Sequence, residues 1–186
     1  MVKTYDQTQS KWIYSKFVTY LHKDETVVGK YLLIKTSSNK TISISSHHFI
    51  ARLNKKQNYK IEFVFAKYLK EKDVLISENS LEDEIIGIEN VYEKGAYAPL
   101  TESGTISVNS IYASCYSNTI IHEIAHIVMQ PIILINKVID YFNLFDLAML
   151  TSTEYPSNYN NGIYWYPNFF YNLLPYIPFS SYAVVF

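Results

Sequence analysis

The first 117 residues contain short apolar or alternating runs separated by polar turns, and this pattern restricts the fold most. Residues 30–35 form a short apolar run, and residues 41–45 alternate polar and apolar side chains with a period of two. The polar stretch between them, residues 36–40, predicts a β-hairpin. Strands this short, with turns between them, favour a mainly β domain. The other predicted strands are residues 61–65, 74–76, 84–91 and 105–111.

The pattern changes after Cys115 to a largely apolar segment, residues 118–150. This segment predicts a helix that begins near Ile120, with Thr119 as its N-terminal cap. Pro131 is expected to break or kink the helix, because proline has no backbone N–H to donate. Polar residues interrupt every window of membrane-spanning length, so we expect no transmembrane helix in this segment.

The composition excludes some classes of partner. The 186 residues carry 16 basic and 17 acidic side chains, a balance that gives no sign of a nucleic-acid partner. The single cysteine, Cys115, cannot form a disulfide within the chain. Residues 1–9 are polar and no apolar stretch follows them, so the sequence shows no signal peptide.

Residues 95–117, GAYAPLTESGTISVNSIYASCYS, are the most distinctive motif of the chain. They resemble the late core segment of the hedgehog autoprocessing module, the Hint domain, which has the form G-x-x-APLT-x-x-GT-x-x-V-(N/D)-x-(V/I)-x-ASCY. Residues 45–50 resemble that family's T-x-x-H motif and the strand after it, and residues 161–166 resemble its NG-I-x-WY run. The resemblance covers nearly the whole chain. It implies a mainly β Hint (hedgehog/intein) fold with a partly helical, apolar C-terminal appendage.

The resemblance also implies a division of the chain into two regions. Residues 1–130 would form the Hint core, and residues 131–186 would correspond to the region that recruits sterol in hedgehogs. The family's domain begins with a catalytic Cys-Phe, whereas this chain begins with Met1-Val2-Lys3. We therefore expect a core that lacks its first strands and its nucleophile, and a chain that is inactive as it stands.

A reaction follows from the resemblance. A hedgehog-type module cleaves the peptide bond before its first residue: the cysteine thiol attacks the preceding carbonyl and forms a thioester, and a sterol hydroxyl then releases the upstream fragment as a sterol ester. The implied partners are that signalling fragment in cis, a sterol or lipid acceptor, and a membrane surface contacted by the C-terminal region. The implied location is the secretory pathway or the extracellular space. Sterol would act as a co-substrate, and no cofactor or metal is expected.

Two candidate site residues come from the T-x-x-H motif. His48 matches the histidine of the motif, and we expect it to polarise the amide and to protonate the departing amine, because imidazole titrates near ~6.5. Ser45 stands where the motif has threonine. Its hydroxyl can still hydrogen-bond the amide or orient the imidazole, although serine is less restricted in its rotamers than threonine.

Two further candidates lie outside that motif. His22 stands where hedgehogs carry the aspartate that acts as base for the sterol hydroxyl, and residues 20–24 resemble the warthog and groundhog branch of hedgehog-related proteins, where histidine is expected. Imidazole can also serve as a base. Cys115 matches the internal cysteine of the ASCY run and is expected to lie near the nucleophile. Its thiol would either exchange with that nucleophile or be buried and inert.

Two other functions are open. The chain could be a non-catalytic Hint relic that binds a lipid or a protein partner through its aromatic tail. Alternatively, His122, Glu123 and His126 fit H-E-x-x-H, the zinc-peptidase signature, with Asp140 or Glu154 as a remote third ligand. The same segment aligns with an H-x-x-A-H stretch that follows ASCY in hedgehogs and binds no zinc there, so we expect no metal.

Overall fold

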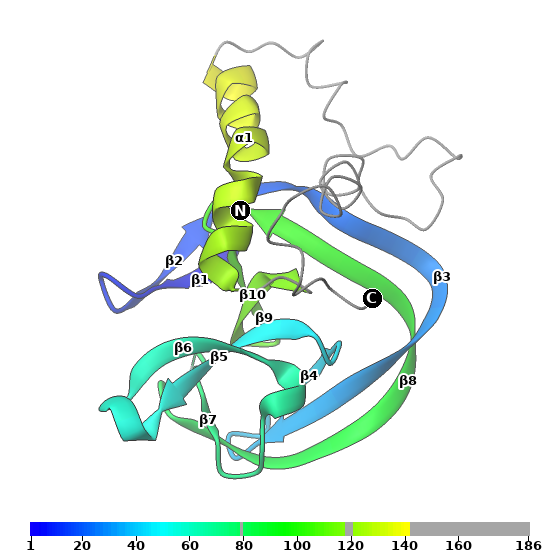
Figure 1. Cartoon of the computed structure of the whole chain (residues 1–186), viewed down its shortest axis with the longest axis vertical. Helices are drawn as coiled ribbons and strands as arrows, with labels where there is room; N and C mark the ends of the chain where they lie inside the picture. The colour runs from blue at the N-terminus through cyan, green and yellow to red at the C-terminus, as the bar shows by residue number, and fades with distance from the viewer. Residues whose placement is uncertain (79, 118–120, 142–186) are drawn as a thin grey trace, which may run out of the picture.

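Two long antiparallel strands, β3 (Phe17–Thr36) and β8 (Asp83–Thr101), run side by side and curve around one side of the molecule (Figure 1). The computed structural model describes residues 1–78, 80–117 and 121–141. The pairing of β3 with β8 shifts register at four places, one of them between Tyr20 and His22. Such bulges bend a strand and redirect its side chains. The predicted strand at residues 84–91 is confirmed, and in the structure it continues to residue 101 as part of β8.

The predicted hairpin at residues 30–45 is confirmed. The end of β3 pairs with β4 (Thr41–Ile44) from Leu32 opposite Ile44 to Lys35 opposite Thr41. The turn contains Asn39 at a φ of 60°. Asparagine tolerates this left-handed conformation better than most residues, so the hairpin closes without an Asn-Gly pair.

The remaining strands complete an eight-stranded sheet in which every recorded pairing is antiparallel. Its order is β4-β3-β8-β7-β5-β10-β9, and β6 pairs with β5. Strands β6 and β7 confirm the predictions for residues 61–65 and 74–76. These strands are β5 (His48–Asn54), β6 (Lys60–Phe65), β7 (Val74–Leu75), β9 (Thr105–Val108) and β10 (Ile111–Ser117).

The prediction of one strand at residues 105–111 is wrong. Asn109 and Ser110 have φ values of 48° and 69°, and Val108 lies opposite Ile111 across them. Two consecutive residues at positive φ make the tight turn that suits the twist of a hairpin. The chain therefore reverses at residue 109 and returns as β10, which contains the ASCY run.

A separate hairpin opens the chain. Strand β1 (Val2–Asp6) pairs with β2 (Lys11–Ser15), and the pair packs on the sheet through an aromatic cluster. Tyr5 contacts Trp12 and Tyr112 with ring centroids 5.3 and 5.7 Å apart, and Phe63 lies 5.6 Å from Tyr112. Edge-on contacts of this kind add to the burial of apolar area. The polar composition of residues 1–9 gave no indication of these two strands.

Helix α1 (His122–Tyr141) follows the sheet. It buries Ala125, Met129, Ile132, Ile133 and Ile139, and Lys16 forms an ion pair with Asp140 near its end. The helix runs through Pro131, so of the predicted break or kink the break does not occur. Proline removes one backbone hydrogen bond, while the residues buried on both sides of it hold the helix against the sheet. Thr119, predicted as its cap, and the appendage beyond Tyr141 lie outside the described residues.

Helix α1 has the length and composition of a membrane-crossing helix, contrary to our expectation from the sequence. Its most apolar window has a mean hydropathy of 1.2, and 28% of that window is buried in the structure. The polar residues of α1 are thus too few to exclude it, by composition, as a membrane-crossing helix. Buried core helices meet the same criterion, so the finding concerns composition only.

Candidate functional site

A pocket of about 250 Å³ gathers the four candidate site residues. His22 reaches it from β3, Ser45 from the turn after β4, His48 from the start of β5 and Cys115 from β10. Three segments that are distant in sequence, at His22, at residues 45–48 and at Cys115, therefore line one pocket. The remaining wall includes part of the APLT run and Ser114, Ile106 and Val108.

A tight turn presents Ser45 and His48 to the pocket. The backbone N–H of His48 donates to the carbonyl of Ser45 at 3.0 Å, and β5 begins at His48. Both side chains are half-buried, and the structure records no protein partner for the Ser45 hydroxyl among the described residues. His47, which precedes His48 in the chain, does not line the pocket. Its Nδ1 lies 3.1 Å from the Ser46 hydroxyl.

The His48 ring is fixed through one nitrogen. Its Nε2 lies 3.0 Å from the carbonyl oxygen of Ser114. Because a carbonyl can only accept, Nε2 must carry the proton, and the neutral ring then has an unprotonated Nδ1. Burial lowers the pKa of His48, and the Ser114 carbonyl opposes part of that shift. The ring is therefore neutral near pH 7, and Nδ1 is the nitrogen that can exchange a proton.

His22 lines the same pocket from β3, one of the two long paired strands. It lies opposite Ala98 in β8, directly after the register shift that begins at Tyr20. The side chain is half-buried. Burial lowers its pKa, and the charge of Asp24 opposes the shift. A neutral imidazole in a pocket can accept a proton from a hydroxyl group.

Cys115 is buried and its thiol is protonated at neutral pH. Burial raises the pKa of the thiol to about 11, against the effect of hydrogen bonds from Thr101. The Thr101 hydroxyl lies 3.6 Å from the sulfur, and the Cys115 N–H donates to the carbonyl of Gly104 at 2.9 Å. Because the thiolate is the reactive form of cysteine, this environment makes Cys115 a weak nucleophile.

We predict that Cys115 reacts very slowly with a thiol reagent in the folded chain. Ellman's reagent at pH 8 should leave it unmodified in native buffer and modify it within minutes after unfolding by guanidinium chloride, because burial and the raised pKa both suppress attack. Glu25, which is exposed, provides a control. Glu25→Cys in a Cys115→Ser background should react at once without denaturant. Rapid modification of native Cys115 would contradict the prediction.

The H-E-x-x-H segment lies on the first two turns of α1, and its histidines contact β10. His122 Nδ1 lies 2.9 Å from the Ser114 hydroxyl, and its ring stacks on Phe63 at 4.0 Å. His126 Nδ1 lies 2.7 Å from the hydroxyl of Tyr116, while Nε2 lies 2.8 Å from the Gln130 amide. The two histidines thus attach the helix to the sheet.

The segment does not form a metal site with the described residues. No group of three His, Cys, Asp or Glu side chains that could hold an ion occurs among residues 1–78, 80–117 and 121–141. Asp140, a suggested third ligand, pairs with Lys16. Glu154, the other, lies outside the described residues. The hydroxyl contacts of His122 and His126 account for both side chains without zinc.

We predict that the contact between α1 and the sheet weakens in acid. Burial lowers the pKa of His122 to about 4, with Glu123 opposing and His126 adding to the shift. Between the unfolded value near ~6.5 and this folded value, the unfolded chain binds more protons, so the free energy of unfolding falls as pH falls. Thermal unfolding at pH 7 and pH 5 measures the loss. His122→Gln should make the pH dependence shallower, and an unchanged dependence would contradict the assignment.

Two residues that the sequence did not single out have a structural part in this site. Ser114 accepts from His48 through its carbonyl and contacts His122 through its hydroxyl. Thr101 lies beside the Cys115 sulfur. Both belong to the motif at residues 95–117, in its ASCY and APLT runs, so the motif was the signal. Their contacts depend on chain segments that local sequence does not bring together.

Comparisons with known proteins give one family match. A sequence profile described as the Hint module matches residues 1–178. Protein hedgehog of Drosophila yakuba is 26% identical over 171 residues, which are 89% of this chain and 37% of that protein. Protein hedgehog of Drosophila melanogaster is 25% identical over 171 residues, covering 89% and 36%. The crystal structure of the PabCDC21-1 intein superposes with a TM-score of 0.51 at 19% identity, over 61% of this chain and 68% of the intein.

These matches differ in what they establish. The similarity to the intein shows the fold alone, because the two sequences are only 19% identical. The hedgehog proteins are distant relatives over most of this chain, but the chain spans little more than a third of their length.

Proposed function

Since the chain belongs to the Hint module family, we propose that it is the processing module of a hedgehog-like precursor, of the kind that cleaves its own chain through a thioester. These 186 residues are proposed to be inactive alone, because their single cysteine is the buried Cys115 and the thiol nucleophile must be supplied. The observation that carries the proposal is the pocket that holds His22, Ser45, His48 and Cys115 together. A pocket with convergent titratable groups is where such chemistry is expected. We further propose that the chain is related to the warthog and groundhog branch, because residues 20–24 with His22 resemble that branch.

The first step needs a thiolate, a polarised amide and a proton for the leaving nitrogen. A thiolate at the start of the module attacks the preceding carbonyl carbon, the C–N bond breaks, and a thioester forms. His48 Nδ1 is the nitrogen that protonates the leaving amine, because Nε2 is engaged by the Ser114 carbonyl. Its lowered pKa makes the imidazolium a stronger acid, so a proton taken up at Nδ1 passes readily to the departing amine. The Ser45 hydroxyl is placed to hydrogen-bond the amide.

The second step releases the upstream fragment. The hydroxyl of an acceptor attacks the thioester carbonyl, the C–S bond breaks, and the thiol returns. His22 takes the hydroxyl proton, since it is neutral and half-buried in the same pocket. The acceptor is a sterol or a similar lipid, recruited by residues 131–186 at a membrane surface. The upstream signalling fragment in cis is the other partner, and the secretory pathway is the location.

A second function is favoured by one observation. The sequence contains a single cysteine, and its pKa is raised to about 11. The described pocket therefore holds no ready thiolate, so these residues alone fit a non-catalytic Hint module that binds a lipid or a protein partner. The two functions differ in whether the pocket supports cleavage once a thiol nucleophile is supplied.

A fusion protein distinguishes the two functions. A reporter ending in glycine is joined to Cys-Phe and the opening segment of a Drosophila hedgehog module, followed by residues 1–186. Cleavage is followed by gel electrophoresis with sterol, with dithiothreitol, and with neither. The autoprocessing proposal expects cleavage with either nucleophile and a sterol-modified product in the sterol sample. An intact, folded fusion in both samples would instead favour the binding function.

A further inference from the structure

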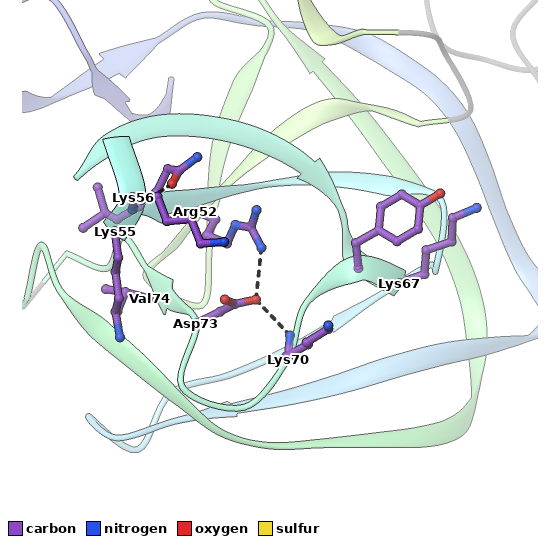
Figure 2. A pocket seen from close by; sticks show the side chains of 10 residues that line it. Arg52, Lys55, Lys56, Lys67, Lys70, Asp73 and Val74 are labelled. Carbon is purple, nitrogen blue, oxygen red and sulfur yellow. Dashed lines mark hydrogen bonds and ion pairs between the residues drawn. The ribbon is translucent and has the colours of Figure 1, made fainter. Parts of the chain in front are cut away.

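A second hollow, away from the candidate site, has an unusual concentration of positive charge. Its volume is about 640 Å³, and it lies between the end of β5, the short helices η1 (Lys55–Gln57) and η2 (Ala66–Tyr68), and the loop before β7 (Figure 2). The chain as a whole has a formal net charge of −1. Of the ten lining residues five are basic and one is acidic; the charged ones are Arg52, Lys55, Lys56, Lys67, Lys70 and Asp73.

The acidic residue, Asp73, already has hydrogen-bond partners within the protein. Asp73 Oδ2 accepts from Arg52 Nη1 at 3.2 Å and from the Lys70 backbone N–H at 2.9 Å. Arg52 also donates to Glu62 Oε1 through Nε and Nη2, at 3.1 and 2.6 Å. Figure 2 shows the contacts of Asp73 with Arg52 and with Lys70. Arg52 is therefore balanced by two carboxylates, and both of them, Glu62 and Asp73, are engaged by its guanidinium.

The lysines around the hollow are not neutralised by the protein. The ammonium of Lys67 lies 5.4 Å from the Phe65 ring and 5.1 Å from the Tyr68 ring, and no salt bridge is recorded for it. The side chains of Lys56 and Lys70 have no recorded partner among the described residues. Figure 2 shows Lys56 on one side of the hollow and Lys67 and Lys70 on the other. Like charges that border one cavity repel, and an anion between them removes that repulsion.

Lys55 differs from these three lysines. Its ammonium donates to the carbonyl of Lys72 at 2.9 Å and lies 3.9 Å from Glu84. It therefore adds charge to the rim while its position is fixed. Three lysines remain with ammonium groups available to a ligand: Lys56, Lys67 and Lys70.

We propose that this hollow is a binding site for a phosphate-bearing anion. A phosphate group offers several acceptor oxygens and a concentrated negative charge, so it can bind ammonium groups from different sides at once. The cavity volume is in the range of small-molecule sites and exceeds the need of a single phosphate. The ligand class is therefore a polar molecule with more than one phosphate, either free in solution or as a lipid headgroup. The proposal does not depend on the processing reaction.

Binding by the whole chain tests the proposal with two probes. Isothermal titration with inorganic pyrophosphate measures the soluble anion. Co-sedimentation with phosphatidylcholine vesicles, with and without phosphatidylinositol 4-phosphate, measures the headgroup. Lys56→Glu with Lys70→Glu should weaken binding about tenfold or more, because two attractive charges become repulsive. The matched control is Lys30→Glu with Lys94→Glu, two exposed lysines in β3 and β8 that undergo the same change of net charge.

Each outcome bears on the proposal. Pyrophosphate binding that is lost in the Lys56/Lys70 variant and kept in the control supports the site with a soluble ligand. Vesicle binding alone, lost in the same selective way, supports it with a lipid headgroup as the source. Equal losses in both double variants would show that only net charge matters and would overturn the proposal. Failure of the unmodified chain to bind either probe would also overturn it. Circular dichroism verifies that both double variants are folded.

Discussion

His48→Ala is expected to reduce cleavage of the fusion protein by at least about 10²-fold, in the range of a lost general acid. The geometry of the ring suits proton delivery: Nε2 is held 3.0 Å from the Ser114 carbonyl, which leaves Nδ1 for exchange. Alanine removes the proton donor and keeps the backbone turn to Ser45. The rate constant of cleavage, measured with dithiothreitol and with sterol, gives the effect.

The neighbouring histidine provides a matched control for this prediction. His47 precedes His48 in the chain but does not line the pocket, so His47→Ala should leave the rate within about twofold of the unmodified fusion, as expected of a surface substitution. The loss in His48→Ala should be similar with dithiothreitol and with sterol, because both pathways require the same thioester. Cleavage by a folded His48→Ala protein at a near-normal rate would remove His48 from the mechanism.

The sequence predicted the kind of fold because local patterns agreed with the final structure. Period-two alternation at residues 41–45 and the apolar run at residues 30–35 became the paired strands β3 and β4. The Hint fold implied by the motif at residues 95–117 is confirmed by the family match and by the intein structure. The reversal at Asn109 was missed, since asparagine and serine at positive φ are not distinguishable from strand residues by polarity alone.

Which residues come together in the pocket was harder to predict from the sequence. His22 and Cys115 lie 93 positions apart, and a register shift near Tyr20 precedes His22. A one-residue shift turns a strand side chain to the other face, so alternation along residues 17–36 does not specify where His22 points. The contact of Ser114 with both His48 and His122 likewise depends on the pairing of β10 with β5 and on the position of α1.

Gly104→Ala is expected to destabilise the fold strongly while it leaves the pocket residues unchanged. Gly104 has a φ of 70°, and a Cβ placed on it would lie 2.5 Å from His126 Nδ1 and 2.8 Å from the Tyr116 hydroxyl. Those two atoms form the 2.7 Å contact between α1 and β10. Backbone strain and overpacking together should lower the free energy of unfolding by about 2–4 kcal/mol. For a chain of this length the midpoint of thermal unfolding should fall by roughly 5–15 °C.

The same substitution at another glycine separates the causes. Gly87, which lies in β8, has no atom within 4 Å of an added Cβ and no positive φ, so Gly87→Ala should change stability by less than about 1 kcal/mol. In a His126→Ala background, Gly104→Ala should cost less than in the unmodified chain, because the ring that blocks the methyl group is gone. An equal cost in both backgrounds would attribute the effect to backbone strain and to the contact with Tyr116 instead of His126. The position of α1 would then not depend on the close approach of Gly104 to His126.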